Sequence, residues 1–196
     1  MRRVVTSVSA ILFAIPIGHA QDCPTEQTAK RGFVVERAAL QKTEVFTGDD
    51  GTVRTSMRYR GQSLLETTLF AGLFSLNRLD RGHRLTYAPL TDLKKLFPLK
   101  VGQKALALFE YSKDGKTMPL TVVLLVKSSE PLAIGPCTYT VLKLERTEGY
   151  GEGVAPRYVY TEYYSPDLKL VLMREYRDPG RPNSFVKFDK VYTIGQ

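Results

Sequence analysis

Glu162 is the carboxylate that this sequence places best for acid–base chemistry. It lies in the stretch YTEYY, beside Tyr160, Tyr163 and Tyr164. Apolar surroundings raise the pKa of a carboxyl group, and hydrolases exploit this effect. A glutamate at a solvent-facing strand position is far commoner, so the sequence favours a structural Glu162. Further carboxylates that could pair with it for acid–base work are Glu145, Glu148, Glu152 and Asp167.

His83 is the one histidine beyond the first 20 residues. A Ser/His/Asp or Cys/His nucleophilic site would need it, but its charged, glycine-containing surroundings (LDRGHR) are typical of a solvated histidine. One histidine and two cysteines do not make the three or four ligands of a usual zinc site. The glycines of residues 149–153 (GYGEG) lack the lysine and following helix of a phosphate loop. We therefore expect no catalytic residues, no metal and no cofactor.

Tyr158, Tyr160 and Tyr164 alternate with their neighbours and share one strand face with Glu162. A binding pocket needs a few polar groups in an otherwise apolar lining. These four residues are the predicted ligand-binding set. The competing interpretation is that this aromatic stretch is core.

Three arginines, Arg54, Arg58 and Arg60, project from one strand face, and Arg78, Arg81 and Arg84 cluster around a turn. An anion-binding face is one interpretation of them. The sequence favours the other, a charged outer face that protects a sheet from edge pairing.

The first 20 residues have the three parts of a cleaved secretory signal peptide. Arg2 and Arg3 precede a mostly apolar run from Val4 to Ile17, which is shorter than the roughly 20 residues of a membrane span. Small residues follow at Gly18 and Ala20. We predict a signal peptide over 1–20, one domain over 21–196 and a periplasmic location. Asp22, directly before Cys23, argues against lipid attachment at that cysteine.

Cys23 and Cys137 are the two cysteines of the chain. In an exported protein such a pair is expected to form a disulfide. Their spacing is not that of a Cys-x-x-Cys redox motif. The sequence predicts a structural disulfide that ties the N-terminal arm to a distant strand.

The chain is basic, with 28 Lys and Arg against 20 Asp and Glu. Removing Arg2 and Arg3 with the signal leaves 26 against 20. In an exported protein this excess indicates an anionic envelope surface before a nucleic acid. Because the charges are spread along the chain, a basic soluble surface is the simpler interpretation.

Most segments beyond residue 30 alternate with the period of two that is typical of half-buried strands. In the stretch 52–60, one face carries Val53, Thr55, Met57 and Tyr59. Turn residues at 48–51 predict a hairpin with residues 32–46. The further predicted strands are 63–70, 84–87, 104–112, 119–127, 137–146, 157–164, 168–177 and 184–194, with connectors at 149–153 and 178–183.

Two short helices are predicted, at residues 91–97 with Thr91 as N-cap, and at 70–79. The fold class is therefore all-β: a single strongly curved antiparallel sheet or half-barrel of nine or ten strands, with one or two short helices. The segment 120–126 (LTVVLLV) is apolar on both faces. We expect a helix, a second layer or a ligand to cover its second face.

Three motifs, FPLKVG at 97–102, IGPCTY at 134–139 and YYSPDL at 163–168, carry a resemblance. In order and spacing over residues 95–178, the chain resembles a group of uncharacterised exported proteobacterial β-rich proteins. That group is distantly similar to periplasmic lipoprotein-carrier half-barrels, which shelter acyl chains against a concave face. The resemblance implies a curved sheet and supplies no catalytic residues.

These observations predict a non-catalytic exported protein that binds an apolar or lipid-like ligand or serves envelope maintenance. Two alternatives stay open: a structural partner protein of an envelope complex, and a hydrolase that uses Glu162 or His83. The sequence does not determine the ligand, the partner or the oligomeric state.

Overall fold

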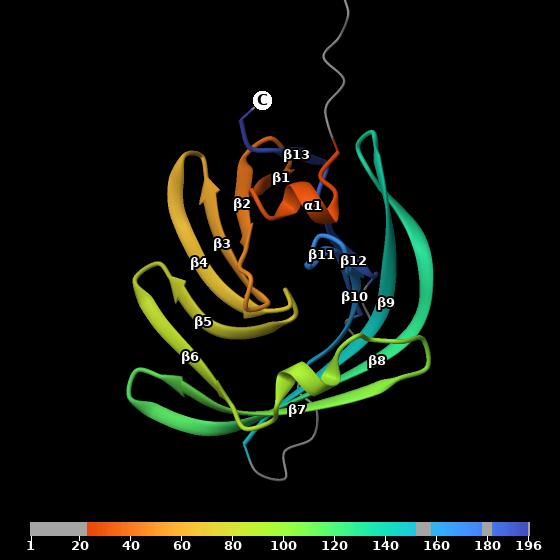
Figure 1. The fold of residues 1–196 in the computed structure, drawn as a ribbon. Helices are drawn as coiled ribbons and strands as arrows, with labels where there is room; N and C mark the ends of the chain where they lie inside the picture. The colour runs from red at the N-terminus through yellow and green to blue at the C-terminus, as the bar shows by residue number, and fades with distance from the viewer. Residues whose placement is uncertain (1–22, 152–157, 178–181, 196) are drawn as a thin grey trace, which may run out of the picture.

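The computed structural model describes residues 23–151, 158–177 and 182–195, which form one antiparallel sheet of 13 strands (Figure 1). From β1 to β12 each strand pairs with the next along the chain, and β13 returns to pair with β1. The strands are β1 Phe33–Arg37, β2 Gln41–Thr47, β3 Thr52–Tyr59, β4 Gln62–Phe70, β5 Phe74–Asp80, β6 His83–Pro89, β7 Lys104–Lys113, β8 Lys116–Ile134, β9 Cys137–Tyr150, β10 Tyr158–Ser165, β11 Leu170–Tyr176, β12 Ser184–Lys187 and β13 Lys190–Thr193.

The two edge strands of this sheet, β12 and β13, are consecutive in the chain. Only Phe188 and Asp189 separate them. Three Cα–Cα steps reach at most about 11 Å, so the two edges approach each other at this link. In the described residues β12 pairs with β11 and β13 with β1, which leaves the ladder open between them. In Figure 1 the strands follow one another around the view from β2 to β9.

The predicted single antiparallel sheet is confirmed, but the predicted number of strands was too low. Residues 32–46 contain two strands, of which β2 pairs with β3 across the Asp49–Gly51 turn. The segment 184–194, expected to be one strand, contains β12 and β13, which lie at opposite edges. The connectors at 149–153 and 178–183 lie partly outside the described residues.

The helix predicted at 70–79 was wrong, because this segment is the end of β4, a tight turn and β5. Ala71 and Gly72 have φ angles of 49° and 71°, which reverse the chain and exclude a right-handed helix. The helix predicted at 91–97 is a 3₁₀ helix over Leu93–Leu96, and Asp92 caps it in place of Thr91. A short helix that the sequence analysis missed, α1 Glu26–Ala29, is closed at its start by a capping box of Thr25 and Thr28. No helix in the described part of the chain is long and apolar enough to span a membrane.

The buried apolar residues form two clusters, which we call the first core and the second core. The first core joins α1, β1, β2, β3, β13, the β8–β9 turn and the β10–β11 turn, through Ala29, Phe33, Val35, Val45, Val53, Ile134, Cys137, Tyr139, Val141, Tyr163, Leu168, Leu170, Leu172 and Val191. The second core joins β5, the 3₁₀ helix and β7 to β10, through Leu73, Phe74, Leu93, Leu99, Ala105, Ala107, Phe109, Leu120, Val122, Leu124, Val126, Leu142, Leu144 and Tyr164.

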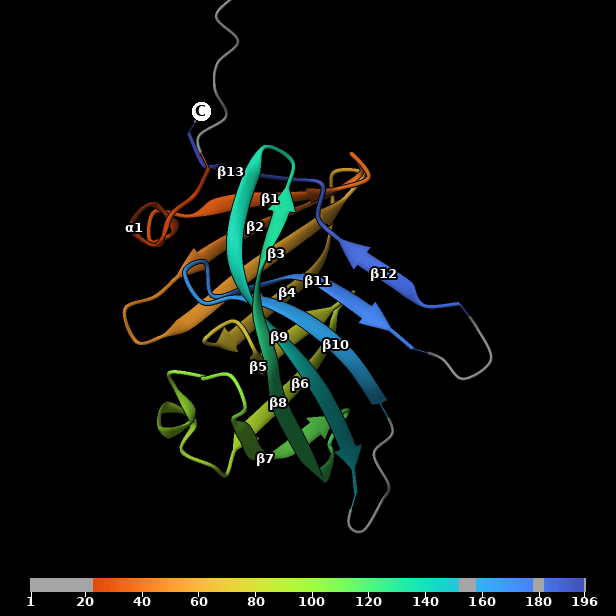
Figure 2. The same cartoon turned by 90° about the vertical axis from the view of Figure 1, so that its right-hand side faces the viewer.

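The long hairpin β8–β9 serves both cores with opposite faces. Tyr139 and Val141 of β9 pack in the first core, whereas Leu142 and Leu144 pack in the second. The pairing register shifts between Val126 and Ser128, and a bulge of this kind increases the local twist. Figure 2 shows the two strands of the hairpin crossing each other in the view.

The inward face of the strand at 120–126 is buried, as Leu120, Val122, Leu124 and Val126 show. In the described residues neither a helix nor a second sheet layer covers its second face, and the alternative of a ligand stays a prediction. The outward side chains of Thr121, Val123 and Leu125 are only half-buried. Beside them on β7, Leu106 and Leu108 are 49% and 41% exposed.

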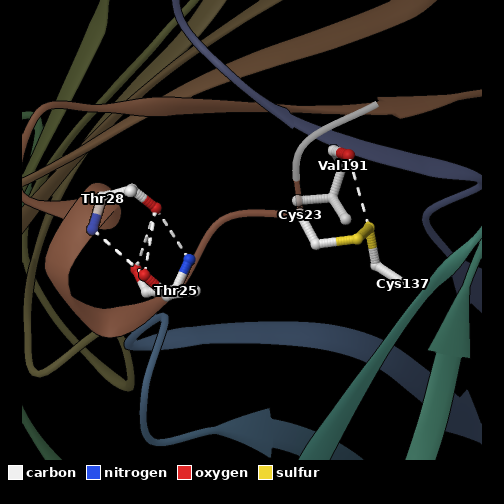
Figure 3. Close-up of a disulfide and its surroundings, with 5 residues drawn as sticks. All are labelled: Cys23, Thr25, Thr28, Cys137 and Val191. Carbon is white, nitrogen blue, oxygen red and sulfur yellow. Dashed lines mark hydrogen bonds between the residues drawn. A yellow bond between two sulfur atoms is a disulfide. The ribbon is translucent and has the colours of Figure 1, made fainter. Parts of the chain in front are cut away.

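The disulfide between Cys23 and Cys137 is present as predicted (Figure 3). It joins residues that are 114 positions apart, with their Cα atoms 5.6 Å from each other. The Cys137 Sγ atom lies 4.0 Å from the carbonyl oxygen of Val191 in β13. The bond therefore fastens the start of the described chain to the first core, where β1 and β13 pair.

Candidate functional site

A cavity of about 350 Å³ lies on the inward face of the sheet, between the second core and the strands β2 to β4. Pockets for small ligands have volumes of roughly 300–1,000 Å³. The lining residues come from both ends of the strand order: Gln41, Thr43, Thr55, Met57, Leu65, Thr67, Leu69, Gly72, Leu73, Phe74, Ser75, Arg78, Tyr87, Phe109, Leu120, Val122, Arg146, Glu148, Tyr150, Tyr160, Leu170, Val171, Met173, Arg174, Val186 and Phe188.

A buried ionic network centred on Glu162 stands behind one wall of this cavity. Glu162 is 0% exposed. Its Oε1 atom accepts hydrogen bonds from Arg174, with both Nε and Nη2 at 2.8 Å, and its Oε2 atom lies 3.5 Å from Nη1 of Arg146. In the pairing register Arg174 is directly opposite Glu162, and Arg146 is a diagonal neighbour on β9. Both oxygens of the carboxylate are therefore occupied by arginines.

Arg146 connects this network to the chain on the far side of the cavity. Its Nε donates to Glu148 at 2.8 Å, and its Nη1 donates to the carbonyl oxygen of Leu73 at 2.8 Å. Burial alone would lower the pKa of Arg146, but the negative charges of Glu162 and Glu148 outweigh it and raise that pKa. The guanidinium thus stays charged and holds the turn between β4 and β5.

Glu148 lines the cavity with its carboxylate already hydrogen-bonded. Tyr160 donates to Oε1 at 3.0 Å, and Tyr150 donates to Oε2 at 3.4 Å. Burial raises the pKa of Glu148, yet the charge and hydrogen bond of Arg146 and the hydrogen bond of Tyr160 lower it more, so the net pKa is lowered. Burial raises the pKa of both tyrosines, so they remain protonated donors.

The β4–β5 turn reaches across the interior to the β10–β11 turn (Figure 1). The hydroxyl of Tyr164 donates to the carbonyl oxygen of Ala71 at 2.8 Å. A Cβ atom added to Gly72 would lie only 1.7 Å from the carbonyl oxygen of Lys169. Glycine is therefore required at position 72, because the two backbones touch there.

The four predicted site residues share one face of β10 and have four different surroundings. Tyr160 lines the cavity and Tyr164 is buried in the second core. Glu162 is enclosed in the ionic network, and Tyr158 is 46% exposed near Tyr150, with the ring centroids 6.2 Å apart. Their role in ligand binding stays a prediction.

The structure does not place His83 beside Glu162, the other candidate catalytic residue. It is the exposed first residue of β6 and pairs across the strand with Asp80, whereas Glu162 is fully buried. Within the described residues, no group of His, Cys, Asp or Glu is arranged to hold a metal ion.

The arginines of the cavity are the site residues that the sequence analysis missed. Arg78 was assigned to a charged turn cluster, but it lies within β5 and lines the cavity. Arg146 and Arg174 were not singled out at all. One signal was available, since Leu144, Arg146 and Glu148 alternate along one strand face, so that a strand buried at Leu144 carries the two charged groups inward.

Comparisons with known proteins reveal a structural likeness to a solved bacterial protein. No family model and no curated protein sequence matches the chain. The crystal structure of the hypothetical lipoprotein YmcC from Escherichia coli (K12) is similar, with a TM-score of 0.47 and 12% sequence identity, over 80% of this chain and 86% of that one.

Proposed function

We propose that this protein is a non-catalytic binding protein of the cell envelope, which holds one small amphipathic ligand inside its sheet. The observation that carries the proposal is the cavity of about 350 Å³, whose lining mixes apolar side chains with arginine, threonine and tyrosine. An engineered protein cavity of about 150 Å³ binds benzene. A cavity of about twice that volume suits a single short chain rather than a two-chain lipid.

We infer that the sheet acts as a half-barrel around this ligand. The two-residue link between the edge strands β12 and β13 supports this, because it brings the ends of the strand order together. The lining supports it too, since Gln41 of β2 and Val186 of β12 border the same cavity. A curved sheet of this kind shelters the apolar part of a ligand from water.

The ionic network supports binding over hydrolysis. A general acid or base must reach the proton that it transfers. The two oxygens of Glu162 already accept from Arg174 and Arg146, and the side chain is fully buried. Glu162 therefore stabilises the wall and orients the arginines.

Location in the envelope is supported by the disulfide, because such bonds persist in oxidising compartments. Cys23 and Cys137 form it here. The predicted signal peptide lies outside the described residues. Export from the cytoplasm remains part of the proposal.

Native mass spectrometry of protein purified from an exporting host tests the binding role. We expect a co-purifying small molecule that is released on unfolding. The chain contains no tryptophan, so a Phe188→Trp variant places a single indole in the cavity wall as a reporter of added amphiphiles. An empty protein whose indole emission responds to no single-chain amphiphile would overturn the proposal.

The structural-partner role is the second candidate, and a separate observation favours it. Leu106 and Leu108 expose a hydrophobic strip on the outward face of β7, and Val159 on β10 is 53% exposed. Replacing both leucines by threonine separates the two roles. If the protein works through its cavity, the double variant should bind amphiphiles and complement a deletion strain as the wild type does. A variant that binds amphiphiles but fails to complement the strain supports the partner role.

A further inference from the structure

The carboxylates around the cavity have their oxygens occupied by protein donors. Both oxygens of Glu162 accept from arginines, and both oxygens of Glu148 accept from Arg146, Tyr160 or Tyr150. A ligand that brings a donor, such as an ammonium group, would have to share these oxygens with donors that the protein already supplies. The chemistry of this wall does not favour a donor.

Arg78, on the opposite wall, still has an N–H group without a hydrogen-bond partner among the described residues. Its Nη2 atom pairs with Asp80, but its Nε atom is buried and bonds to none of the described groups. A buried donor without a partner costs free energy, which an added acceptor would recover. The side chain is 40% exposed, so it has room to turn its Nε edge toward a ligand.

Two hydroxyl groups continue the polar strip that starts at Arg78. In the pairing register Thr67 is directly opposite Arg78, and Thr55 is directly opposite Thr67. All three line the cavity, while the next pair along the strands, Met57 and Leu65, is apolar. One wall therefore carries a narrow polar strip beside a hydrophobic surface, which matches a ligand with one polar end.

The charges of the cavity decide whether that polar end is ionised. Among the described residues, the arginines that line the cavity are Arg78, Arg146 and Arg174. They pair with three carboxylates, Asp80, Glu148 and Glu162. An anionic or cationic ligand would add a charge to a balanced and partly desolvated set, and such a charge is costly to bury.

On the basis of the proposed function, we infer that the ligand is an uncharged single-chain amphiphile whose ester, amide or similar carbonyl oxygen accepts hydrogen bonds from Arg78 and Thr67. Its apolar chain lies against Met57 and Leu65. This assigns Arg78 as the residue that selects the polar end of the ligand.

Four probes of similar size test the inference through the emission of the Phe188→Trp reporter at pH 7: methyl octanoate, octanoate, octylammonium and butylbenzene. We expect methyl octanoate to bind about tenfold or more tightly than either ion, because an ion would bring an uncompensated charge into the balanced and partly desolvated set. One hydrogen bond to a charged group is worth about tenfold in affinity. In the reporter background, Arg78→Met is expected to lower the affinity for methyl octanoate about tenfold. The affinity for butylbenzene, which lacks a carbonyl acceptor, should be unchanged.

Two further variants isolate the role of Arg78. Arg78→Lys keeps the positive charge but lacks Nε, so it should not restore binding of the ester. Arg84→Met removes an exposed arginine from the next strand, where it pairs with Leu79 rather than with Arg78. This control variant should bind all four probes with unchanged affinity.

The outcomes distinguish this inference from the proposed function. If either ion binds as tightly as the ester, or if Arg78→Met leaves ester binding intact, the inference is overturned while the binding role stands. If none of the four probes binds, the proposed function fails with it.

Discussion

The first core and the second core are built by one sheet, yet they differ in composition and in what they border. The first core consists of aliphatic and aromatic side chains and is fastened by the disulfide, with Phe33, Val35, Val45, Val53 and Val191 all at 0% exposure. The second core borders the cavity and the ionic network, since Phe74 and Phe109 belong to it and also line the cavity.

The disulfide-fastened core and the candidate site therefore lie at separate ends of the same hairpin. β9 contributes Tyr139 and Val141 to the first core through one face, and Leu144 and Arg146 to the interior near the cavity through the other. The members of the first core carry no charge. Beside the second core, buried charges hold the cavity wall in place, and such charges are costly unless each is paired.

Loss of the disulfide is the strongest test of the first core. Cys23→Ala with Cys137→Ala should lower the free energy of unfolding by about 4–5 kcal/mol in the chain-entropy model, because the bond closes a long loop. Urea unfolding of the oxidised wild type and the double variant measures this. Reduced wild type is the matched control, and a midpoint equal to that of the oxidised protein would contradict the anchoring role.

Removal of the central carboxylate tests the second region. Glu162→Gln removes the buried counter-charge of Arg174 and one of the two counter-charges of Arg146. It should cost about 3 kcal/mol, since breaking a buried ion pair on one side is strongly destabilising. The control is Glu145→Gln. Glu145 pairs with Lys127 at the surface, with both side chains more than 40% exposed, so its loss should cost less than about 1 kcal/mol. Equal losses for the two variants would count against the buried network.

The smallest expected effect is a pH dependence that comes from Glu148. Its pKa is lowered below the reference value of 4.5 in the folded protein, so its stabilising contribution is present above about pH 4.5 and is lost as pH falls through the lowered pKa. Denaturant unfolding from pH 7 to pH 3 should show a shallower loss of stability in Glu148→Gln than in the wild type. Tyr160→Phe, which removes one hydrogen bond to Glu148, should lie between them, and identical slopes for all three would refute this assignment.

The alternation of apolar and polar residues was enough to predict much of this fold. It correctly placed Thr55 and Met57 on one face, and both line the cavity. It failed at residues 70–79, where the apolar stretch FAGLF fits a helix as well as two strand ends. Only the left-handed backbone of Ala71 and Gly72, together with the contact to Lys169, makes this segment a turn.

The ionic network could not be predicted because it depends on cross-strand register. Arg174 meets Glu162 only because the pairing of β10 with β11 shifts by one residue between Tyr163 and Tyr164. The same sequence without that bulge would turn every side chain beyond it to the other face. Strand periodicity says which residues share a face, but it does not say which residues on two strands are opposite each other.

The return of β13 to β1 has a consequence for the order in which the chain becomes native. Tyr192 of β13 donates a hydrogen bond to Glu36 of β1 across 156 positions of sequence, and Val191 completes the first core. Every other strand pairing joins neighbours along the chain and can form as the polypeptide emerges. β1 keeps one edge unpaired until the last residues arrive, and contacts over such separations form slowly. As the chain folds, the first strand therefore waits for the last, and a protein truncated before residue 190 would present that bare edge to its neighbours.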